Sequence, residues 1–281
     1  MYYAKDDTKT KYKICLFIHY SISDSVPHYV KIYINQLSNH FDEVKILTNN
    51  KNIGNEDCSF KKNVCFWYNQ NQGYDFGMFY QFIEITDLSC YSQIACINDS
   101  NVLLNKLDKV MNWGNATDSD FWGIIDSDEK PWFSSHSNNY HIQSHFMIFN
   151  KKAIDKLPGF FRDLNVPGIF NEKNIKKLRR LVIDKWEIGL SQYFLNERLK
   201  VASFIESKQL ILKYQPKKQN ITHSLYYELA AEGYPLLKKK VVWEKKKRFK
   251  NDTPLWMQTI KQFGNSDYET NKIIDELLQV P

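Results

Sequence analysis

The chain has 281 residues, of which 43% are hydrophobic and 15% are aromatic. This length and composition allow a full hydrophobic core, in one large α/β domain or two small ones, and exclude disorder for the bulk of the chain. The formal net charge of +6 is modest, so the place of the positive charges matters more than their number.

The first fifty residues predict a strand, a helix and a second strand. Residues 13–20 form a near-continuous apolar run, which is typical of a strand buried on both faces. Apolar residues recur at helical spacing over 26–37, and residues 42–49 read as a strand that ends in turn residues. This order predicts a βαβ unit with a right-handed crossover.

Strands and helices continue to alternate along the rest of the chain. Further strands are expected over 64–68, 93–97, 120–126, 141–150 and 201–205. Further helices are expected over 76–88, 103–113, 154–161, 171–183 and 186–199, with Pro158 and Gly159 interrupting the third of these. No linker rich in Pro, Gly or Ser separates domains. We therefore predict one α/β domain over 1–240 and a basic helical segment over 241–281, packed on that domain or trailing from it.

A glycine-containing turn precedes the helix predicted from residue 76. It reads Asn71-Gln72-Gly73-Tyr74-Asp75-Phe76-Gly77, and its glycines let the backbone approach a ligand closely. Asp75 is interpreted either as the N-cap of that helix or as a hydrogen-bonding partner of a donor nucleotide or sugar. Gly73 and Tyr74 are donor-site candidates beside it.

The strand over 93–97 ends in Asn98, Asp99 and Ser100. Ligands of open α/β sheets bind outside the carboxyl ends of the strands, so these three residues are donor-site candidates. Hard oxygen ligands there suit Mg²⁺ or Mn²⁺, which would offset the charge of a diphosphate. The alternative is a turn that caps the next helix. His19 and Tyr20 end the first strand, where an aromatic ring could stack on a nucleobase.

Two other carboxylates are candidates for catalysis. Asp126 ends the strand over 120–126 and is expected to face the same crevice as Asp99 and to contact the sugar, with a surface turn as the alternative. Glu187 is expected at the start of the helix over 186–199. The helix dipole there would keep the carboxylate ionised, as a general base must be, or would simply pair with it.

Three more polar residues complete the candidate site. His141 and Gln143 precede an apolar strand and are interpreted as acceptor-side residues, or as ordinary strand polarity. His223 follows Asn220-Ile221-Thr222, outside any apolar run. It could return to the pocket to complete a metal site beside Asp99 or to touch the leaving diphosphate, and the alternative is a surface histidine.

Eight basic residues and one acidic residue lie between Lys238 and Lys250. The simplest interpretation is a solvated helix face or tail; the functional alternative is peripheral contact with an anionic membrane surface, and no nucleic acid partner is expected. Five cysteines without a CxxC pair predict a reducing compartment. The charged first thirteen residues do not resemble a signal peptide, and no window holds 18 apolar residues. We therefore expect a cytoplasmic protein.

Taken together, these segments resemble the rhamnan synthesis protein F family of glycosyltransferases. The matching motifs occur in order within about residues 64–240: N-x-GYDFG at 71–77, hydrophobic-Asn-Asp-Ser at 97–100, DFWG-x-x-DS at 120–127, H-x-QS-x-F-hydrophobic-x-F at 141–149, E-x-x-x-S at 187–191, N-x-TH at 220–223 and G-x-P-x-x-K at 233–238. Two departures are Ile221, where the family usually has a proline, and the lack of an Asp-x-Asp pair around Asp99.

The resemblance implies a GT-A-like open, mostly parallel, twisted sheet flanked by helices. It also implies a nucleoside-diphosphate sugar donor, typically an activated deoxyhexose such as rhamnose, and a cell-surface polysaccharide, glycan or lipid-linked saccharide as acceptor. We expect an inverting glycosyltransferase with Glu187 as base, and with Mn²⁺ or Mg²⁺ held by Asp99 and His223. The rival interpretation is a non-catalytic glycan- or nucleotide-sugar-binding module. A second rival is a metal-dependent phosphoesterase. It would need several clustered His and Asp ligands for two metals, and this chain has only scattered ones.

Overall fold

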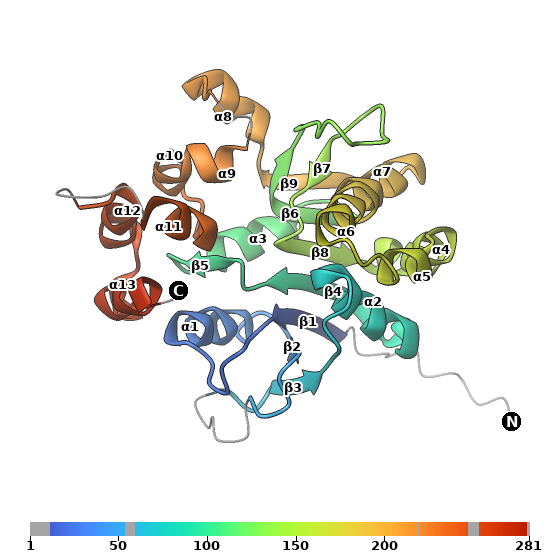
Figure 1. Cartoon of the computed structure of the whole chain (residues 1–281), viewed down its shortest axis with the longest axis horizontal. Helices are drawn as coiled ribbons and strands as arrows, with labels where there is room; N and C mark the ends of the chain where they lie inside the picture. The colour runs from blue at the N-terminus through green and yellow to red at the C-terminus, as the bar shows by residue number, and fades with distance from the viewer. Residues whose placement is uncertain (1–11, 54–59, 218–219, 247–252, 280–281) are drawn as a thin grey trace, which may run out of the picture.

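A mixed, mostly parallel sheet of eight strands forms the centre of the described part of the molecule (Figure 1). The computed structural model describes residues 12–53, 60–217, 220–246 and 253–279. The strand order is β3-β2-β1-β4-β8-β6-β7, and β9 pairs with β6. These strands are β1 Tyr12–His19, β2 Glu43–Thr48, β3 Val64–Tyr68, β4 Tyr91–Asn98, β6 Phe121–Ser127, β7 His141–Ile142, β8 Phe146–Asn150 and β9 Val201–Ile205. The expected open α/β sheet is confirmed.

The direction of the strands places several of their carboxyl ends at one edge. The pairs β1–β2, β1–β4, β2–β3 and β6–β9 are parallel. Strand β8 runs antiparallel to both β4 and β6. Since β4 and β6 therefore run the same way, the ends of β1, β4 and β6 point towards the same side of the molecule.

Helices cover both faces of this sheet, with α1 and α9–α13 on the left and α2 and α4–α7 on the right in Figure 1. The helical segments are α1 His28–Leu37, α2 Tyr74–Ile85, η1 Leu88–Cys90, α3 Asp108–Ala116, α4 Lys151–Asp163, α5 Val166–Phe170, α6 Ile175–Val182, η2 Ile183–Ile188, α7 Gly189–Asn196, α8 Ser207–Tyr214, α9 Ile221–Ser224, α10 Tyr226–Ala231, α11 Lys239–Lys246, α12 Leu255–Phe263, η3 Ser266–Tyr268 and α13 Thr270–Gln279. Within the described ranges, none of these helices has the length and apolarity to cross a bilayer.

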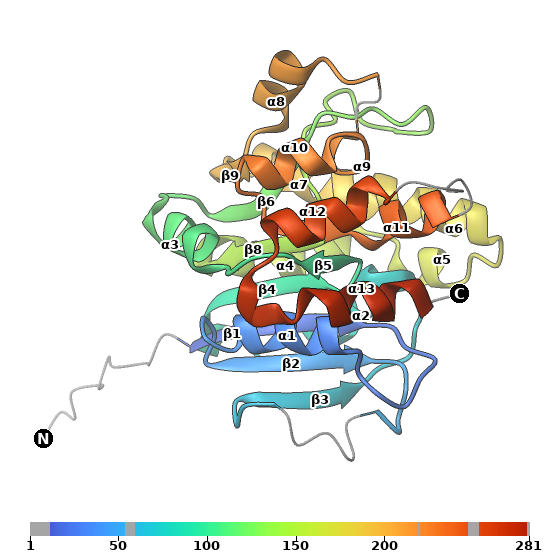
Figure 2. The ribbon, with the colours of Figure 1, turned by 90° about the vertical axis from the view of Figure 1, so that its left-hand side faces the viewer.

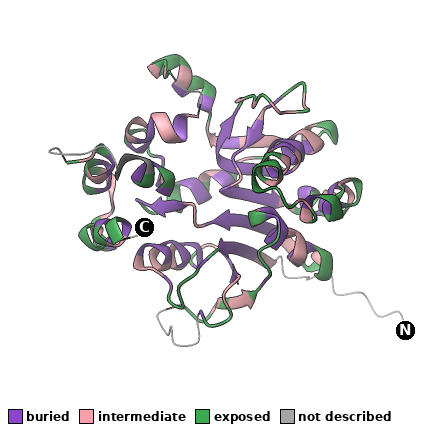
Figure 3. Ribbon diagram, in the orientation of Figure 1, coloured by how far each residue is buried: buried purple, intermediate pink, exposed green. Residues whose placement is uncertain are grey.

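The alternation of side chains along the central strands builds two hydrophobic cores. In β1, Cys15 and Phe17 belong to the core under α1, whereas Ile14, Leu16 and Ile18 belong to the core under α2. This period of two follows from the pleat of a strand, and both faces are apolar because helices cover both. Figure 3 shows the central strands buried and the outer faces of the helices exposed.

Two predicted elements were wrong because pairing between distant segments decides them. Residues 101–103 form strand β5 (Asn101–Leu103), which pairs antiparallel with β10 (Leu236–Lys238), so the helix expected from residue 103 begins only at Asp108. The single strand expected over 141–150 is two strands, because a turn that joins Phe146 N to Gln143 O separates β7 from β8.

The expected helix boundaries in the middle of the chain were also wrong. Helix α4 continues through Pro158, since its buried face carries apolar residues on both sides of the proline. That burial outweighs the roughly 3 kcal/mol cost of a proline inside a helix. Segments α6, η2 and α7 follow one another without a break, and η2 is a π-helical turn. Glu187 therefore lies inside a continuous helix and not at a helix start.

The last helices pack on the first one. Trp256 and Ile260 of α12 and Ile274 of α13 belong to the same core as α1, and α13 lies beside α1 (Figure 2). The Glu276 carboxylate accepts hydrogen bonds from the backbone N–H groups of His28 and Tyr29, at 3.0 and 3.2 Å. Helix α1 has no side-chain cap at its own N-cap residue, so α13 supplies the acceptors for these N–H groups.

Candidate functional site

A cavity of about 1040 Å³ opens at the carboxyl ends of the central strands. Tyr20 follows β1, Asp99 and Ser100 follow β4, and Ser127 ends β6, and all of them line this cavity. Its other walls come from the turn before α2, from α6 and η2, from the loop before β7, and from residues near Asn220 and Lys239. This is the place where open α/β sheets bind their ligands.

Most of the predicted site residues meet here. The lining includes Tyr20, Gly73, Tyr74, Asp75, Asp99, Ser100, His141, Gln143, Glu187 and His223. His19 and Asn98 are buried and hold Asp99 and Asp75 from behind, as described below. These residues come from segments far apart in the sequence, so the fold gathers them at one place.

Asp126 is the exception, and its predicted contact with the sugar was wrong. Its carboxylate is buried and accepts hydrogen bonds from Ser203 Oγ at 2.8 Å and from Ser207 N at 2.7 Å. Because β9 runs parallel to β6, the end of β6 lies beside the start of α8, where Asp126 satisfies the first N–H group. Ser127, the next residue, lines the cavity.

Two basic side chains hold Asp99. Its Oδ2 atom lies 2.7 Å from His19 Nδ1 and 3.2 Å from Lys239 Nζ. The parallel register places Ile18 beside Asn98, which brings His19 next to Asp99. Burial alone would raise the pKa of Asp99, but Lys239 and His19 outweigh burial and hold that pKa below its ordinary value. Since β5 and not a helix comes next, the helix-capping interpretation of this turn was wrong.

Asn98 connects the strand end to Asp75. Its Nδ2 group donates to Asp75 Oδ2 at 2.5 Å, and its Oδ1 atom accepts from Ser100 N and Oγ at 3.1 and 2.6 Å. Burial, followed by the negative charge of Asp99, raises the pKa of Asp75 to about 7. The N-cap of α2 is Gly73, so Asp75 is not the cap that one interpretation expected.

The turn that presents Asp75 has an unusual backbone. Gly73 and Tyr74 both have positive φ values, 77° and 58°. For a tyrosine such a conformation costs of the order of 1 kcal/mol, and strained residues of this kind cluster at functional sites. A Cβ atom on Gly77 would lie only 1.4 Å from the carbonyl oxygen of Gln72. The turn can therefore fold back on α2 only with glycine at this position.

Glu187 reaches the cavity from the π-helical turn η2. The predicted role of a helix dipole at Glu187 was therefore wrong. The Ser144 hydroxyl donates a hydrogen bond to Glu187 Oε1, which fixes the carboxylate at the wall. Single π-helical turns frequently occur at functional sites, because they re-aim side chains within a helix.

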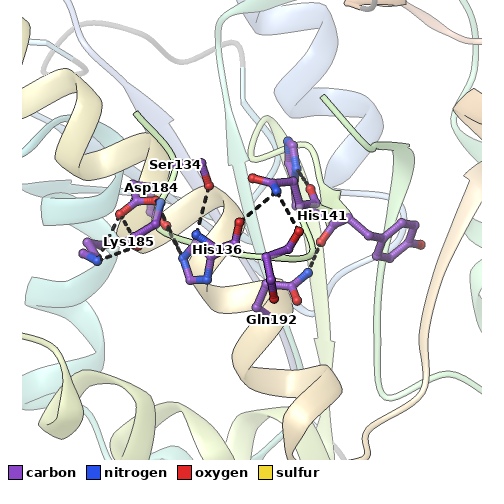
Figure 4. Close-up of polar contacts among 10 residues, drawn as sticks. Ser134, His136, His141, Asp184, Lys185 and Gln192 are labelled. Atoms are coloured by element: carbon purple, nitrogen blue, oxygen red, sulfur yellow. Dashed lines mark hydrogen bonds and ion pairs between the residues drawn. The ribbon is translucent and has the colours of Figure 1, made fainter. Parts of the chain in front are cut away.

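The loop before β7 is anchored to the same π-helical turn (Figure 4). The Asp184 carboxylate accepts hydrogen bonds from Ser135 N and Oγ, both at 2.8 Å. His136 Nε2 donates to the Asp184 carbonyl oxygen at 3.0 Å, and Lys185 Nζ lies 3.0 Å from Ser135 Oγ. These contacts tie one wall of the cavity to the helix that carries Glu187.

His141 lines the cavity at the end of this loop. Its Nδ1 atom donates to the carbonyl oxygen of Asn139 at 2.7 Å. Gln192 of α7 donates to the carbonyl oxygen of Tyr140 at 2.6 Å (Figure 4). His141 is therefore held in one orientation at the wall.

Three consecutive lysines were missed as site residues. Lys238, Lys239 and Lys240 line the cavity, and Lys239 is buried. The run Lys238–Lys250, expected to face solvent or a membrane, thus begins inside the site, and residues 247–250 lie outside the described residues. The signal in the sequence was the motif G-x-P-x-x-K, whose last residue is Lys238.

A buried histidine supports the first of these lysines. Lys238 Nζ lies 3.5 Å from His145 Nδ1, and His145 Nε2 lies 2.7 Å from Tyr234 Oη. Burial lowers the pKa of His145 well below its ordinary value and lowers that of Lys238 to about 8. An ammonium group can only donate, so His145 is neutral, with Nδ1 as acceptor and Nε2 donating to Tyr234. His145 stands within the H-x-QS-x-F motif but was not predicted as a site residue.

The residues around Asp99 fit a divalent cation poorly. No group of three or more His, Cys, Asp or Glu side chains in the described ranges could hold a metal ion. Asp99 and His223, the predicted ligands, both line the cavity. The Lys239 ammonium group, however, lies 3.2 Å from Asp99 Oδ2 and competes with any cation for that oxygen.

Comparison with known proteins identifies a family. Residues 45–281 match the family model described as rhamnan synthesis protein F. A search of the curated proteins gave no match. Among solved structures, the glycosyltransferase GlyE of Streptococcus pneumoniae TIGR4 is similar, with 11% identity and a TM-score of 0.44, over 97% of this chain and 65% of that one. The 4-diphosphocytidyl-2C-methyl-D-erythritol synthase of Anaerococcus prevotii DSM 20548 has 10% identity and a TM-score of 0.42, over 70% and 89%.

Proposed function

This chain belongs to the rhamnan synthesis protein F family, and from that premise we propose that it is a glycosyltransferase that uses a nucleoside-diphosphate sugar. The observation that carries the proposal is the convergence of Asp75, Asp99, Glu187 and His223 on one cavity at the carboxyl ends of the strands. Several polar groups that converge in a large pocket, with a carboxyl group of strongly raised pKa among them, are typical of an active site.

The donor is proposed to bind between the turn before α2 and the ends of β1 and β4. Tyr20 and Tyr74 are 53% and 38% exposed, and both line the cavity, so either ring can stack on a nucleobase. Asp75 and Ser100 provide hydrogen-bonding groups for the nucleotide or the sugar. Asn98 positions both groups from behind, and His19 positions Asp99. Neither Asn98 nor His19 lines the cavity.

The proposed reaction is a single displacement at the anomeric carbon. The bond between that carbon and the diphosphate oxygen breaks, and its electron pair leaves with the diphosphate. The acceptor hydroxyl oxygen forms the new bond from the opposite side, and Glu187 takes its proton. His141 and Gln143 line the wall proposed for the acceptor. The expected outcome is inversion.

The identity of donor and acceptor rests on the family alone. A deoxyhexose such as rhamnose and a cell-surface polysaccharide, glycan or lipid-linked saccharide are the proposed pair. The sequence led us to expect Mn²⁺ or Mg²⁺, and the position of Lys239 beside Asp99 argues against a metal there. Activity with and without a chelator tests this expectation. A cytoplasmic location and contact of the basic segment with lipid also stay predictions from the sequence.

A screen of UDP-, GDP- and dTDP-sugars for nucleotide release without acceptor tests the proposal. We expect slow hydrolysis of at least one of them. Glu187→Gln should lower acceptor-dependent turnover about 100-fold or more, as the loss of a general base does, with donor affinity little changed. Glu84→Gln is the matched control, since Glu84 is exposed on α2 and does not line this cavity. Binding of a nucleoside diphosphate without turnover of any sugar nucleotide would instead favour the non-catalytic binding module.

A further inference from the structure

The pairing of β10 with β5 brings two lysines to the strand end that carries Asp99. Lys238 is the register partner of Asn101, and Lys239 N donates to Ser100 O at 2.9 Å. Main-chain hydrogen bonds thus hold the Lys238–Lys239 pair beside the proposed donor site. Both side chains line the cavity, so the pair is part of its wall and not of a surface tail.

Lys239 presents an ordered positive charge at this wall. Its side chain is only 10% exposed, and its Nζ atom lies 3.2 Å from Asp99 Oδ2. The Nζ atom also lies 5.6 and 5.8 Å from the ring centroids of Tyr29 and Trp243. An ammonium group has three N–H donors, and Asp99, which also pairs with His19, accepts one of them. A second anion in the cavity can therefore bind the same ammonium group.

The positive charge of Lys238 is less compensated by nearby groups than that of Lys239. The Lys238 Nζ atom lies 3.5 Å from Nδ1 of His145, and that ring is neutral. Burial lowers the pKa of Lys238 to about 8, although Glu187 and Asp75 act in the opposite direction. A partly buried ammonium group beside a neutral imidazole gains stability when an anion enters the cavity.

We propose that Lys238 and Lys239 form a subsite for the diphosphate of the donor, so that two ammonium groups of the protein offset the charge of the leaving group in place of a divalent cation. This inference rests on the proposed function and specifies how that function treats its leaving group. It agrees with the poor fit of Asp99 to a metal ion, because Lys239 uses the Asp99 oxygen that a metal would need. Helix α11 begins at Lys239, so its N–H groups add positive potential at the same wall.

Calorimetric titration in the presence of EDTA tests the subsite. The probes are inorganic pyrophosphate, which carries no base, and UDP, GDP and dTDP. We expect the wild-type protein to bind at least one nucleoside diphosphate without a metal, with affinity that falls as salt is added. Lys238→Gln and Lys239→Gln should each weaken binding about 10- to 100-fold, the loss of one charge-assisted hydrogen bond. Lys261→Gln, on the exposed face of α12, is the matched control and should bind like the wild type.

The outcomes separate this inference from the proposed function. Binding that appears only after Mn²⁺ is added, or unchanged affinity in both lysine variants, overturns the subsite and leaves the glycosyltransferase proposal standing. No binding of any nucleoside diphosphate by the wild type, with or without Mn²⁺, counts against both. Lys239→Arg keeps the ion pair with Asp99 and should retain most of the affinity. If Lys239→Gln fails to fold, Lys238→Gln decides the result.

Discussion

At the scale of single residues, Asp75 makes folding stability depend on pH. Burial and the charge of Asp99 raise its pKa from the ordinary 3.8 to about 7, against the hydrogen bond from Asn98. Between these two values the folded chain binds more protons than the unfolded chain. The stability that the protonated carboxyl contributes is therefore complete below about pH 4 and is lost as the pH rises through about 7.

Asp75→Asn removes this ionisation and keeps an amide oxygen that can accept the hydrogen bond from Asn98. We expect the variant to be more stable than the wild type at pH 8, by about 2–4 kcal/mol, and equally stable near pH 4. Urea unfolding at a series of pH values measures the difference. A variant that is less stable than the wild type at pH 8 would contradict the raised pKa.

The sequence identified site residues where a local pattern determines their place. Asp99 follows a buried strand, and Asp75 stands in a turn with two glycines, so both could be placed at the end of a sheet. Lys239 and His145 could not, because their roles depend on contacts with Asp99 and Lys238, which lie far away in the chain. Asp126 also lies near the end of a strand, but its carboxylate is bound by Ser203 of the neighbouring strand β9 and by the first N–H group of α8.

At the scale of elements, the turn before α2 depends on one glycine. A Cβ atom on Gly77 would overlap the carbonyl oxygen of Gln72, and backbone atoms cannot move away as a flexible side chain can. We expect Gly77→Ala to lower the free energy of unfolding by about 4 kcal/mol or more, or to displace Asp75 and abolish donor binding. Thermal unfolding and titration with a nucleoside diphosphate check both results. An alanine variant that is as stable as the wild type and binds equally well would show that the turn tolerates a side chain.

Periodicity predicted those elements whose burial is continuous along the sequence. The strands β1, β4 and β6 lie close to their expected bounds, because an apolar run in a covered sheet has one stable placement. Helix α4 was misjudged at Pro158, since packing on both sides of the proline outweighs its local cost. Strand β5 was misjudged because its partner β10 lies more than a hundred residues later.

At the scale of the whole molecule, Glu276 links the two ends of the described chain. Its carboxylate accepts from the first N–H groups of α1, which has no cap of its own. We expect Glu276→Ala to destabilise the protein by about 1 kcal/mol, the usual cost of losing a helix cap, and Glu276→Gln to cost less because one acceptor oxygen remains. Urea unfolding measures both. Equal stability of Glu276→Ala and the wild type would mean that water replaces the carboxylate without loss.

The position of β10 in the chain has a consequence for synthesis. Strands β1 and β4 are translated early, so the segments that carry His19 and Asp99 are made more than a hundred residues before Lys238. The lysines at 238 and 239 and the helices that cover α1 are translated much later. The segments that carry the nucleotide side of the pocket are therefore made before Lys238 and Lys239, so the proposed diphosphate subsite is the last part of this wall to be completed.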